Sequence, residues 1–420
     1  MVIIDGKKLS PSKKIIDDLK LQIIYMPLES KLGYNYHPIV HQGDYVCIGE
    51  TIAQNKVADL YLKSSVSGTV VGIRKKYISN GTLVDCIAIE NDFKGKYLNK
   101  PGKIRKLANY NKDEFITMLK EYGISGLGGS DYPTYLKYSV DSKIHYLVVN
   151  GAECEVYSSS DNALMYEYTE EILEAIDAIM EIMNIPKAYI AINENNNKII
   201  KQFLKYINTY PNIKVYPLPD GYPNGWERNI VSEIFGMTYE KDPMELGILV
   251  NNVATIYSIY EMLKYKRPLT TRIVTIAGEG IKRPANYKLK IGSNFSEIML
   301  KTGDLVKLKN PIIIAGGALM GKSIPSEELI VTRDLSTILV LNNKEEEVNP
   351  CIKCGKCSEV CPVGLMPSLI VNEDKKKKVK YLDKCLECGL CSYVCPSKIE
   401  VREKVIEFKE KKNDRVSSSK

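Results

Sequence analysis

Two cysteine runs, 351-CIKCGKCSEVCP-362 and 385-CLECGLCSYVCP-396, decide the fold of the C-terminal part of this chain. Each run has the spacing C-x2-C-x2-C-x3-C-P, which is the bacterial pattern for a pair of [4Fe–4S] clusters. Three thiolates wrap a tight loop around one cube, and the fourth ligates the other cube. We therefore expect one cluster on Cys351, Cys354, Cys357 and Cys395, and a second on Cys361, Cys385, Cys388 and Cys391.

Zinc is the alternative for so many clustered cysteines. Structural zinc sites are closed tetrahedra, commonly built from two CxxC pairs, and two four-cysteine runs with a trailing proline fit that arrangement poorly. The other three cysteines are scattered, and no secretory signal precedes them, so a disulfide framework is not expected. These are Cys47, Cys86 and Cys154.

Composition indicates a protein of several domains. The 420 residues are 44% apolar, but no apolar run is long enough to span a bilayer. We expect a cytoplasmic location, free or peripheral on the cytoplasmic membrane. The net charge of +7 fits solubility, and no basic, aromatic-interleaved motif predicts a nucleic-acid partner. The run Lys375–Lys378 is interpreted as a solvated loop, with a docking surface for an acidic electron carrier as the alternative.

N-terminal to the cysteine runs, the pattern of apolar residues and glycines changes twice along the sequence. Residues 31–90 read as short strands separated by glycine turns, which predicts a β-domain of hairpins. From about Tyr110, helical and strand periodicities alternate, which predicts an α/β domain with a parallel sheet; Asn111 and Glu114 form a capping-box signature at its first helix. A third unit with strands at 272–277 and 312–314 follows, and a terminal helix is expected after Val401.

Two segments of the α/β domain are candidates for cofactor binding. Glycines in the loop 123–137 let backbone N–H groups approach a phosphate or a flat ring, and Lys137 offers a countercharge. The turn Asn150–Glu155 follows a predicted strand, where ligands bind in open α/β sheets. A plain connector and two solvated acids, Glu153 and Glu155, are the simpler interpretations of the two segments.

The order of these parts resembles the C subunit of the Rnf ferredoxin–NAD oxidoreductase family and, more distantly, the flavin subunit of respiratory complex I. The resemblance implies a multidomain α/β plus β fold. A barrel-sandwich (lipoyl/biotinyl-like) β-domain covers residues 1–105, a Rossmann-like domain for FMN and NADH 106–268, and an SLBB-like β-grasp domain 269–342. An α+β double-cluster ferredoxin module at 343–400 and a charged tail at 401–420 complete the chain.

The resemblance also implies cofactor-binding residues. The glycine loop would lie against flavin and nicotinamide, the lysine would meet the FMN phosphate region, and the acidic turn and an asparagine pair would hold the flavin. The matching positions are Gly126, Gly128, Gly129, Lys137, Asn150, Glu153, Glu155, Asn251 and Asn252. Tyr222–Gly225 and Ala315–Gly321 match two further segments of the family.

The loop departs from the family's pattern in one position of consequence. Asp131 replaces a glycine, and an anion pointing inward there would repel the phosphates of FMN or NADH. The departure, with a missing N-terminal HIGAP motif, suggests a divergent branch similar to the electron-transfer protein associated with D-proline reductase.

Two functions are compatible with the sequence. In the first, electrons pass from NADH through FMN and two [4Fe–4S] clusters to a partner, either a reductase such as proline reductase or an Rnf-type membrane complex. In the second, the chain is a cluster-only wiring subunit that has lost flavin or NADH binding.

Overall fold

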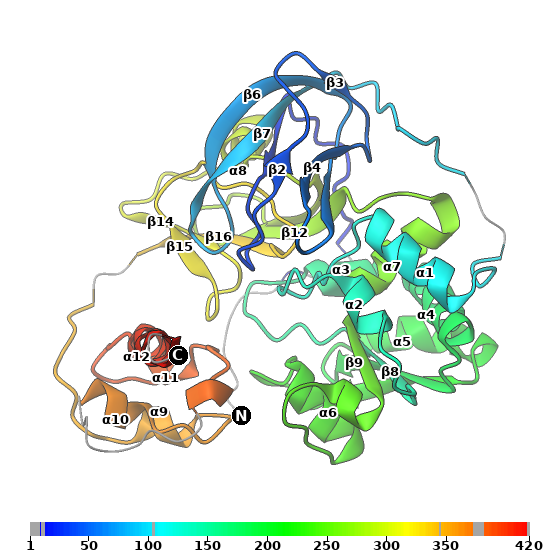
Figure 1. Cartoon of the computed structure of the whole chain (residues 1–420). Helices are drawn as coiled ribbons and strands as arrows, with labels where there is room; N and C mark the ends of the chain where they lie inside the picture. The colour runs from blue at the N-terminus through cyan, green and yellow to red at the C-terminus, as the bar shows by residue number, and fades with distance from the viewer. Residues whose placement is uncertain (1–8, 10–12, 103–105, 344–345, 373–381, 418–420) are drawn as a thin grey trace.

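The fold is described from a computed structural model, which describes residues 9, 13–102, 106–343, 346–372 and 382–417 (Figure 1). The run Lys375–Lys378 lies outside these residues. Among the described helices, none combines the length and apolar character that crossing a bilayer requires.

Two antiparallel sheets form the N-terminal unit, as the glycine-punctuated pattern predicts. One has the order β1(Ile23–Pro27)-β7(Leu83–Asn91)-β6(Gly68–Tyr77)-β3(Tyr45–Val46). The other has the order β2(His37–Pro38)-β4(Thr51–Asn55)-β5(Leu60–Lys63). Gly68 is required at its position because a Cβ there would collide with the carbonyl of Glu90 on the paired strand.

A parallel four-stranded sheet with helices forms the α/β unit, which confirms the predicted alternation. Its order is β10(Ile213–Leu218)-β9(Lys187–Asn193)-β8(Tyr146–Asn150)-β11(Ile248–Asn252). The helices are α1(Lys112–Glu121), α2(Thr134–Tyr138), α3(Ser160–Glu167), α4(Thr169–Met183), α5(Asn197–Tyr206), α6(Glu227–Phe235) and α7(Val253–Tyr265). The predicted capping box is present at the start of α1.

This sheet reverses its direction of growth between β8 and β11. The chain runs from β8 outward through β9 to β10, and then returns to place β11 on the other side of β8. In open parallel sheets, ligands bind beyond the carboxyl ends of the strands at such a reversal. A ligand site is therefore expected at the ends of β8 and β11.

The third unit is a mixed sheet with one helix. Its order is β13(Ala285–Lys290)-β12(Thr271–Ala277)-β16(Thr337–Asn342)-β14(Pro311–Ala315)-β15(Lys322–Ile324), and α8(Phe295–Thr302) follows β13. The N-terminal segment also reaches this sheet, because Ile16 forms a bridge to Tyr287.

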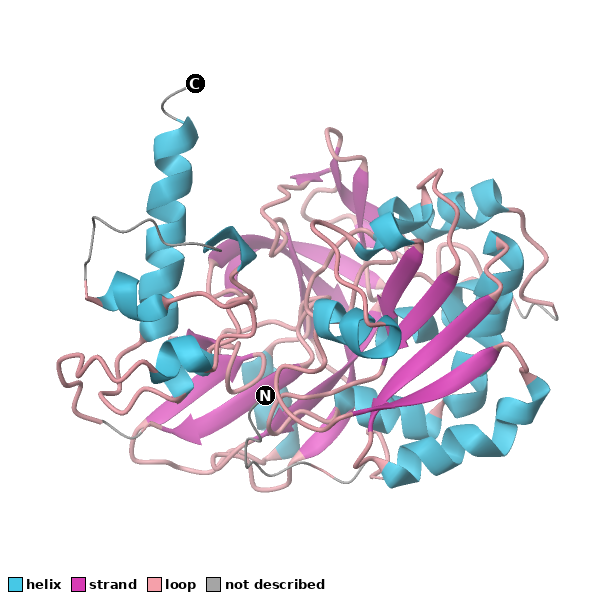
Figure 2. Cartoon of the chain, turned by 90° about the horizontal axis from the view of Figure 1, so that it is seen from below, coloured by secondary structure: helices cyan, strands magenta, loops and turns pink. Residues whose placement is uncertain are grey.

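A small helical module ends the chain. It contains α9(Lys356–Glu359), α10(Pro367–Val371), α11(Leu390–Tyr393) and the long α12(Val401–Ser417), which stands against the shorter helices (Figure 2). Its apolar core comprises Leu365, Leu382, Ile399, Val401 and Val405.

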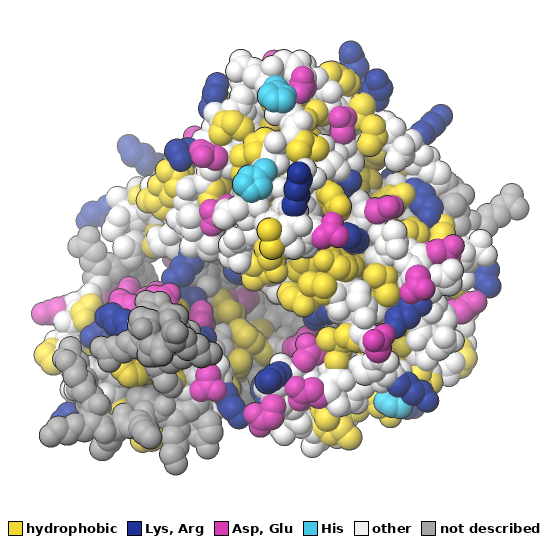
Figure 3. All heavy atoms as spheres, viewed as in Figure 1, with side chains coloured by type: hydrophobic (Ala, Val, Ile, Leu, Met, Phe, Trp, Pro, Cys, Tyr) yellow, Lys and Arg dark blue, Asp and Glu magenta, His cyan; other side chains and the backbone are white. Residues whose placement is uncertain are grey.

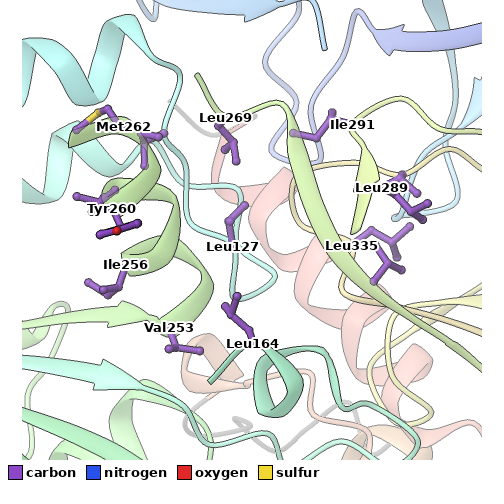
Figure 4. Packing of buried hydrophobic residues seen from close by; sticks show 14 of the residues in the cluster. Leu127, Leu164, Val253, Ile256, Tyr260, Met262, Leu269, Leu289, Ile291 and Leu335 are labelled. Atoms are coloured by element: carbon purple, nitrogen blue, oxygen red, sulfur yellow. The ribbon is translucent and has the colours of Figure 1, made fainter. Parts of the chain in front are cut away.

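The main core joins the α/β unit to the third sheet. Leu127 of the glycine loop lies between Val253 and Ile256 of α7 on one side and Leu335, just before β16, on the other (Figure 4). Leu127 and the equally buried Ile124 thus anchor the glycine loop in the core.

Candidate cofactor and cluster sites

Two cavities in the C-terminal module are lined by the eight predicted ligands. Cys351, Cys354, Cys357 and Cys395 line the first, which we name the outer cavity. Cys361, Cys385, Cys388 and Cys391 line the second, which we name the inner cavity. The grouping is the one that the spacing predicts, including the exchange of the fourth cysteine between the runs.

The surroundings of the thiols suit a cluster more than a single ion. Four thiols line each of the two cavities, so the donors are spread around a space and not around a point. Backbone amides of Lys353 and Leu365 donate to the sulfurs of Cys351 and Cys361 at 3.4 and 3.3 Å. Such bonds lower the electron density on cluster thiolates. The four-thiol cavities therefore fit [4Fe–4S] clusters in donor type and arrangement.

The inner cavity is joined to the α/β unit. The Tyr222 hydroxyl donates to the Cys388 carbonyl at 2.7 Å, and both residues are buried. Gly389 lies so close to the Leu319 carbonyl that a Cβ would collide with it. Trp226 and Met320 pack into the same apolar cluster. Cys354 of the outer cavity, by contrast, is exposed.

Asparagines meet at the sheet reversal. Asn150 ends β8 and is paired in register with Asn252, which ends β11. The Asn252 Oδ1 accepts from the Ala254 amide at 2.9 Å and caps α7, which turns its Nδ2 toward Asp161 Oδ2, 2.7 Å away. Asn150 donates to the Gly225 carbonyl at 2.8 Å. The neighbouring Asn251 is buried and donates to the Tyr138 hydroxyl at 2.8 Å.

The glycine loop closes over this edge of the sheet. A Cβ on Gly128 would lie 3.0 Å from Asn252 Cβ, so the missing side chain permits the close approach. The Leu127 amide donates to Thr255 Oγ1 at 2.9 Å, and the buried Arg272 donates to the Leu127 carbonyl. Lys31 donates to the Gly129 carbonyl at 2.8 Å.

Two of the predicted charged residues form contacts across units or strands. Lys137 Nζ donates to the Val250 carbonyl at 3.0 Å and forms an ion pair with Glu227 at 3.4 Å. Glu155 accepts from the amides of Leu319 and Met320 at 3.1 and 3.0 Å, which ties the acidic turn to the loop beside the inner cavity.

Glu153 is buried and serves the start of α3. Its carboxylate accepts from Ser158 Oγ, Ser160 Oγ and the amides of Asp161 and Asn162. A carboxylate at a helix N-terminus is favoured because the first amides of a helix lack partners. Glu153 therefore shapes the turn that carries Asp161, a residue that no local sequence pattern singles out.

Asp131 does not point at the site. Its carboxylate forms an ion pair with Arg333, with Nε–Oδ1 at 2.9 Å and Nη2–Oδ2 at 3.2 Å. Arg333 also donates to the Tyr36 hydroxyl at 3.1 Å, so the pair links the glycine loop to the N-terminal unit. The φ angle of Asp131 is 52°, a left-handed conformation that Asp tolerates better than most residues. The carboxylate is thus paired with a cation 202 residues distant in the sequence.

The outer surface near the N-terminal unit is mixed in charge. Lysine, arginine, aspartate and glutamate side chains are interspersed with apolar ones over the face seen in Figure 3, and no single sign of charge dominates it. This agrees with the modest net charge of +7.

Comparison with known proteins places the chain in a family. The RnfC barrel sandwich hybrid domain matches residues 2–94, the Nuo51 FMN-binding domain matches 119–261, and the 4Fe-4S dicluster domain matches 350–399. The C subunit of the ion-translocating oxidoreductase complex of Rhodobacter capsulatus is 31% identical over 356 residues, which cover 82% of this chain and 68% of that protein. The chain belongs to the RnfC family.

Other RnfC proteins are similarly related. The C subunit of the Na(+)-translocating ferredoxin:NAD(+) oxidoreductase complex of Acetobacterium woodii is 30% identical, covering 83% of this chain and 80% of that protein. The proton-translocating counterpart of Clostridium ljungdahlii is 29% identical, covering 87% and 81%. An NAD+-reducing [NiFe]-hydrogenase structure aligns over 56% of this chain and 48% of that chain, with a TM-score of 0.48 and 14% identity.

Family membership confirms the barrel-sandwich, FMN-binding and dicluster domains. This RnfC chain is an iron–sulfur flavoprotein subunit of electron transfer, with FMN and [4Fe–4S] clusters as its cofactors. The missing Cβ of Gly128 lets the glycine loop lie directly against Asn252 at the sheet reversal.

Proposed function

We propose that this RnfC chain takes electrons from NADH and passes them singly through both clusters to a membrane-bound redox partner. One observation carries the proposal. The α/β unit places Asn150 beside Asn252 at the sheet reversal, and the same unit contacts Cys388 of the inner cavity through Tyr222. FMN supplies the exchange of one hydride for two single electrons. The protein supplies binding, orientation and a route.

The residues act in two ways under this proposal. The backbone of Gly126, Gly128 and Gly129 and the side chains of Lys137, Asn150 and Asn252 hold FMN. Glu153, Glu155 and Asn251 position the others, because their polar atoms are engaged by α3, by Leu319 and Met320, and by Tyr138. Lys137 would exchange its long contact with Glu227 for the phosphate region of FMN.

Electrons enter the clusters at the inner cavity. Tyr222, Trp226 and Leu319 pack in one apolar cluster with Cys388, and the proposed route crosses this contact. The outer cavity, with its exposed Cys354, is the exit. The eight thiolates belong to two clusters in series, as the shared fourth cysteines require.

The finer domain assignments belong to the same proposal. We assign a barrel-sandwich domain to 1–105, a Rossmann-like domain to 106–268, an SLBB-like β-grasp domain to 269–342 and the ferredoxin module to 343–400, followed by the tail 401–420. The relatives are subunits of ion-translocating complexes, which supports a membrane complex as partner and peripheral attachment on the cytoplasmic side. A reductase such as proline reductase is the alternative partner, which the divergent loop suggests.

Anaerobic purification with cofactor analysis tests the proposal. The protein should contain FMN and about eight irons, and NADH should bleach the flavin band before the clusters are reduced. Gly128→Ala should weaken FMN binding by about tenfold, because the new Cβ displaces Asn252. Gly102→Ala is the matched control, since no atom of the described residues lies within 4 Å of its Cβ position.

The wiring-subunit alternative predicts a different outcome. Such a protein would have cluster absorbance, would take up no FMN and would not oxidise NADH with an artificial acceptor. The orientation of Asp131 toward Arg333 removes the main reason for that alternative, since the anion is already paired.

A further inference from the structure

A second carboxyl group lies beside the asparagines at the sheet reversal. Asp161 is the second residue of α3, and its Oδ2 accepts from Asn252 Nδ2 at 2.7 Å. Asn252 has no freedom to rotate this donor away, because its Oδ1 caps α7. Asp161 is partly exposed, whereas its neighbours Ser160 and Asn162 are buried. The half-buried carboxyl group therefore lies at the edge of the sheet where FMN is proposed to bind.

The surroundings of Asp161 disfavour a second negative charge. The carboxylate of Glu153 accepts hydrogen bonds from Ser158 and Ser160 and from the amides of Asp161 and Asn162, which places a second carboxyl group beside Asp161. Arg272 of β12 is the cation facing this region, and it donates its N–H groups to the carbonyls of Leu127, Arg333 and Leu335. The start of α7 contributes the uncharged Asn252. Burial and, second, the charge of Glu153 raise the pKa of Asp161 to about 7.

We propose that Asp161 is a proton-holding residue of the flavin site, which takes up a proton when the site gains negative charge and releases it when that charge leaves. The proposal rests on the proposed function. A hydride from NADH brings two electrons and one proton, so its arrival adds one negative charge. Asp161 takes one proton from solvent and restores the charge. When the two electrons leave singly for the two clusters, the hydride's proton and the Asp161 proton both return to solvent.

Charge balance of this kind needs proximity but no proton path to the flavin ring. Charges attract or repel through the intervening protein, so a new negative charge at this edge raises the pKa of Asp161 further. Asp161 acts on the reaction through this field and is a positioning residue. It touches Asn252, and Asn252 touches the glycine loop.

Proton uptake measured during flavin reduction tests the assignment. The holoprotein is reduced anaerobically in weak buffer with a pH indicator, across roughly pH 6 to 8, and protons are counted per flavin. On reduction, the unsubstituted protein should take up a fraction of a proton per flavin more than Asp161→Asn does. This difference should depend on pH and be largest near neutral pH. Asp161→Asn should lose that fraction while keeping FMN, and Asp161→Glu should regain it. Asp177→Asn, an exposed acid on α4 whose pKa is also raised by burial, is the control and should match the unsubstituted protein.

A second measurement uses the unsubstituted protein alone. An infrared difference spectrum should gain the carbonyl band of a protonated carboxyl group on reduction at neutral pH, and its absence would overturn the assignment. Equal proton uptake by Asp161→Asn with FMN bound would also overturn it, leaving the proposed function intact. If the unsubstituted protein binds no FMN, both the proposed function and this assignment fall.

Discussion

The ion pair between Asp131 and Arg333 leads to the sharpest prediction about stability. Both side chains are largely buried, with 5% and 17% of their surfaces exposed, and two close N···O contacts join them. Replacing Asp131 by Ala leaves the guanidinium buried beside the Tyr36 hydroxyl, without its carboxylate. Removing one partner of a buried ion pair lowers the free energy of unfolding by about 3–5 kcal/mol. Because the arginine is partly exposed, we expect a loss of about 3 kcal/mol here.

Hydrogen exchange in the glycine loop measures this cost locally, where a multidomain chain lacks a single unfolding free energy. The amides of Gly126 and Asp131 are bonded across the loop, to the Tyr132 and Gly126 carbonyls at 2.8 and 2.9 Å. In Asp131→Ala, the Gly126 amide should exchange about 150-fold faster.

A matched control and a double variant complete the test. The exposed pair Lys75–Asp85 has 63% and 53% of its side chains exposed, so Asp85→Ala should change exchange of its own strand by far less. Removing both Asp131 and Arg333 should cost less than the sum of the two single changes, since no unpaired charge is left. Unchanged exchange in Asp131→Ala would refute the reasoning, as would Asp131→Gly raising FMN affinity, which would mean that the anion faces the cofactor.

Three other residues, Glu155, Cys354 and Asp161, give predictions of their own. Glu155→Gln should weaken the two bonds to the loop 317–321 by about 1–2 kcal/mol and slow the reduction of the clusters by bound flavin, measured by stopped-flow absorbance, while FMN content stays unchanged. Cys354→Ser should remove about half of the iron by colorimetric assay, whereas Cys47→Ser, a buried cysteine of the N-terminal unit, should leave iron content intact. The raised pKa of Asp161 means that folding stability from this group is present at low pH and is lost as pH rises through about 7; in urea titrations, Asp161→Asn should flatten that decline.

The sequence alone determined the cluster module, because its ligands are local. Cysteines three residues apart must share one tight loop, so the ligand grouping follows from spacing and reappears in the lining of the two cavities. The alternation of helices and strands could also be predicted from the sequence, since amphipathic periodicity and the capping box of Asn111 and Glu114 depend only on neighbouring residues.

What only the tertiary structure decided is where distant side chains point. Asn150 meets Asn252 because β11 returns to the far side of β8, a matter of sheet order that no local pattern encodes. Asp131, read in the sequence as an obstacle to phosphate, is turned away by Arg333 from the segment before β16. The contacts of Asp131, Glu153 and Asp161 are made with residues that packing brings near them, so neighbouring sequence could not predict them.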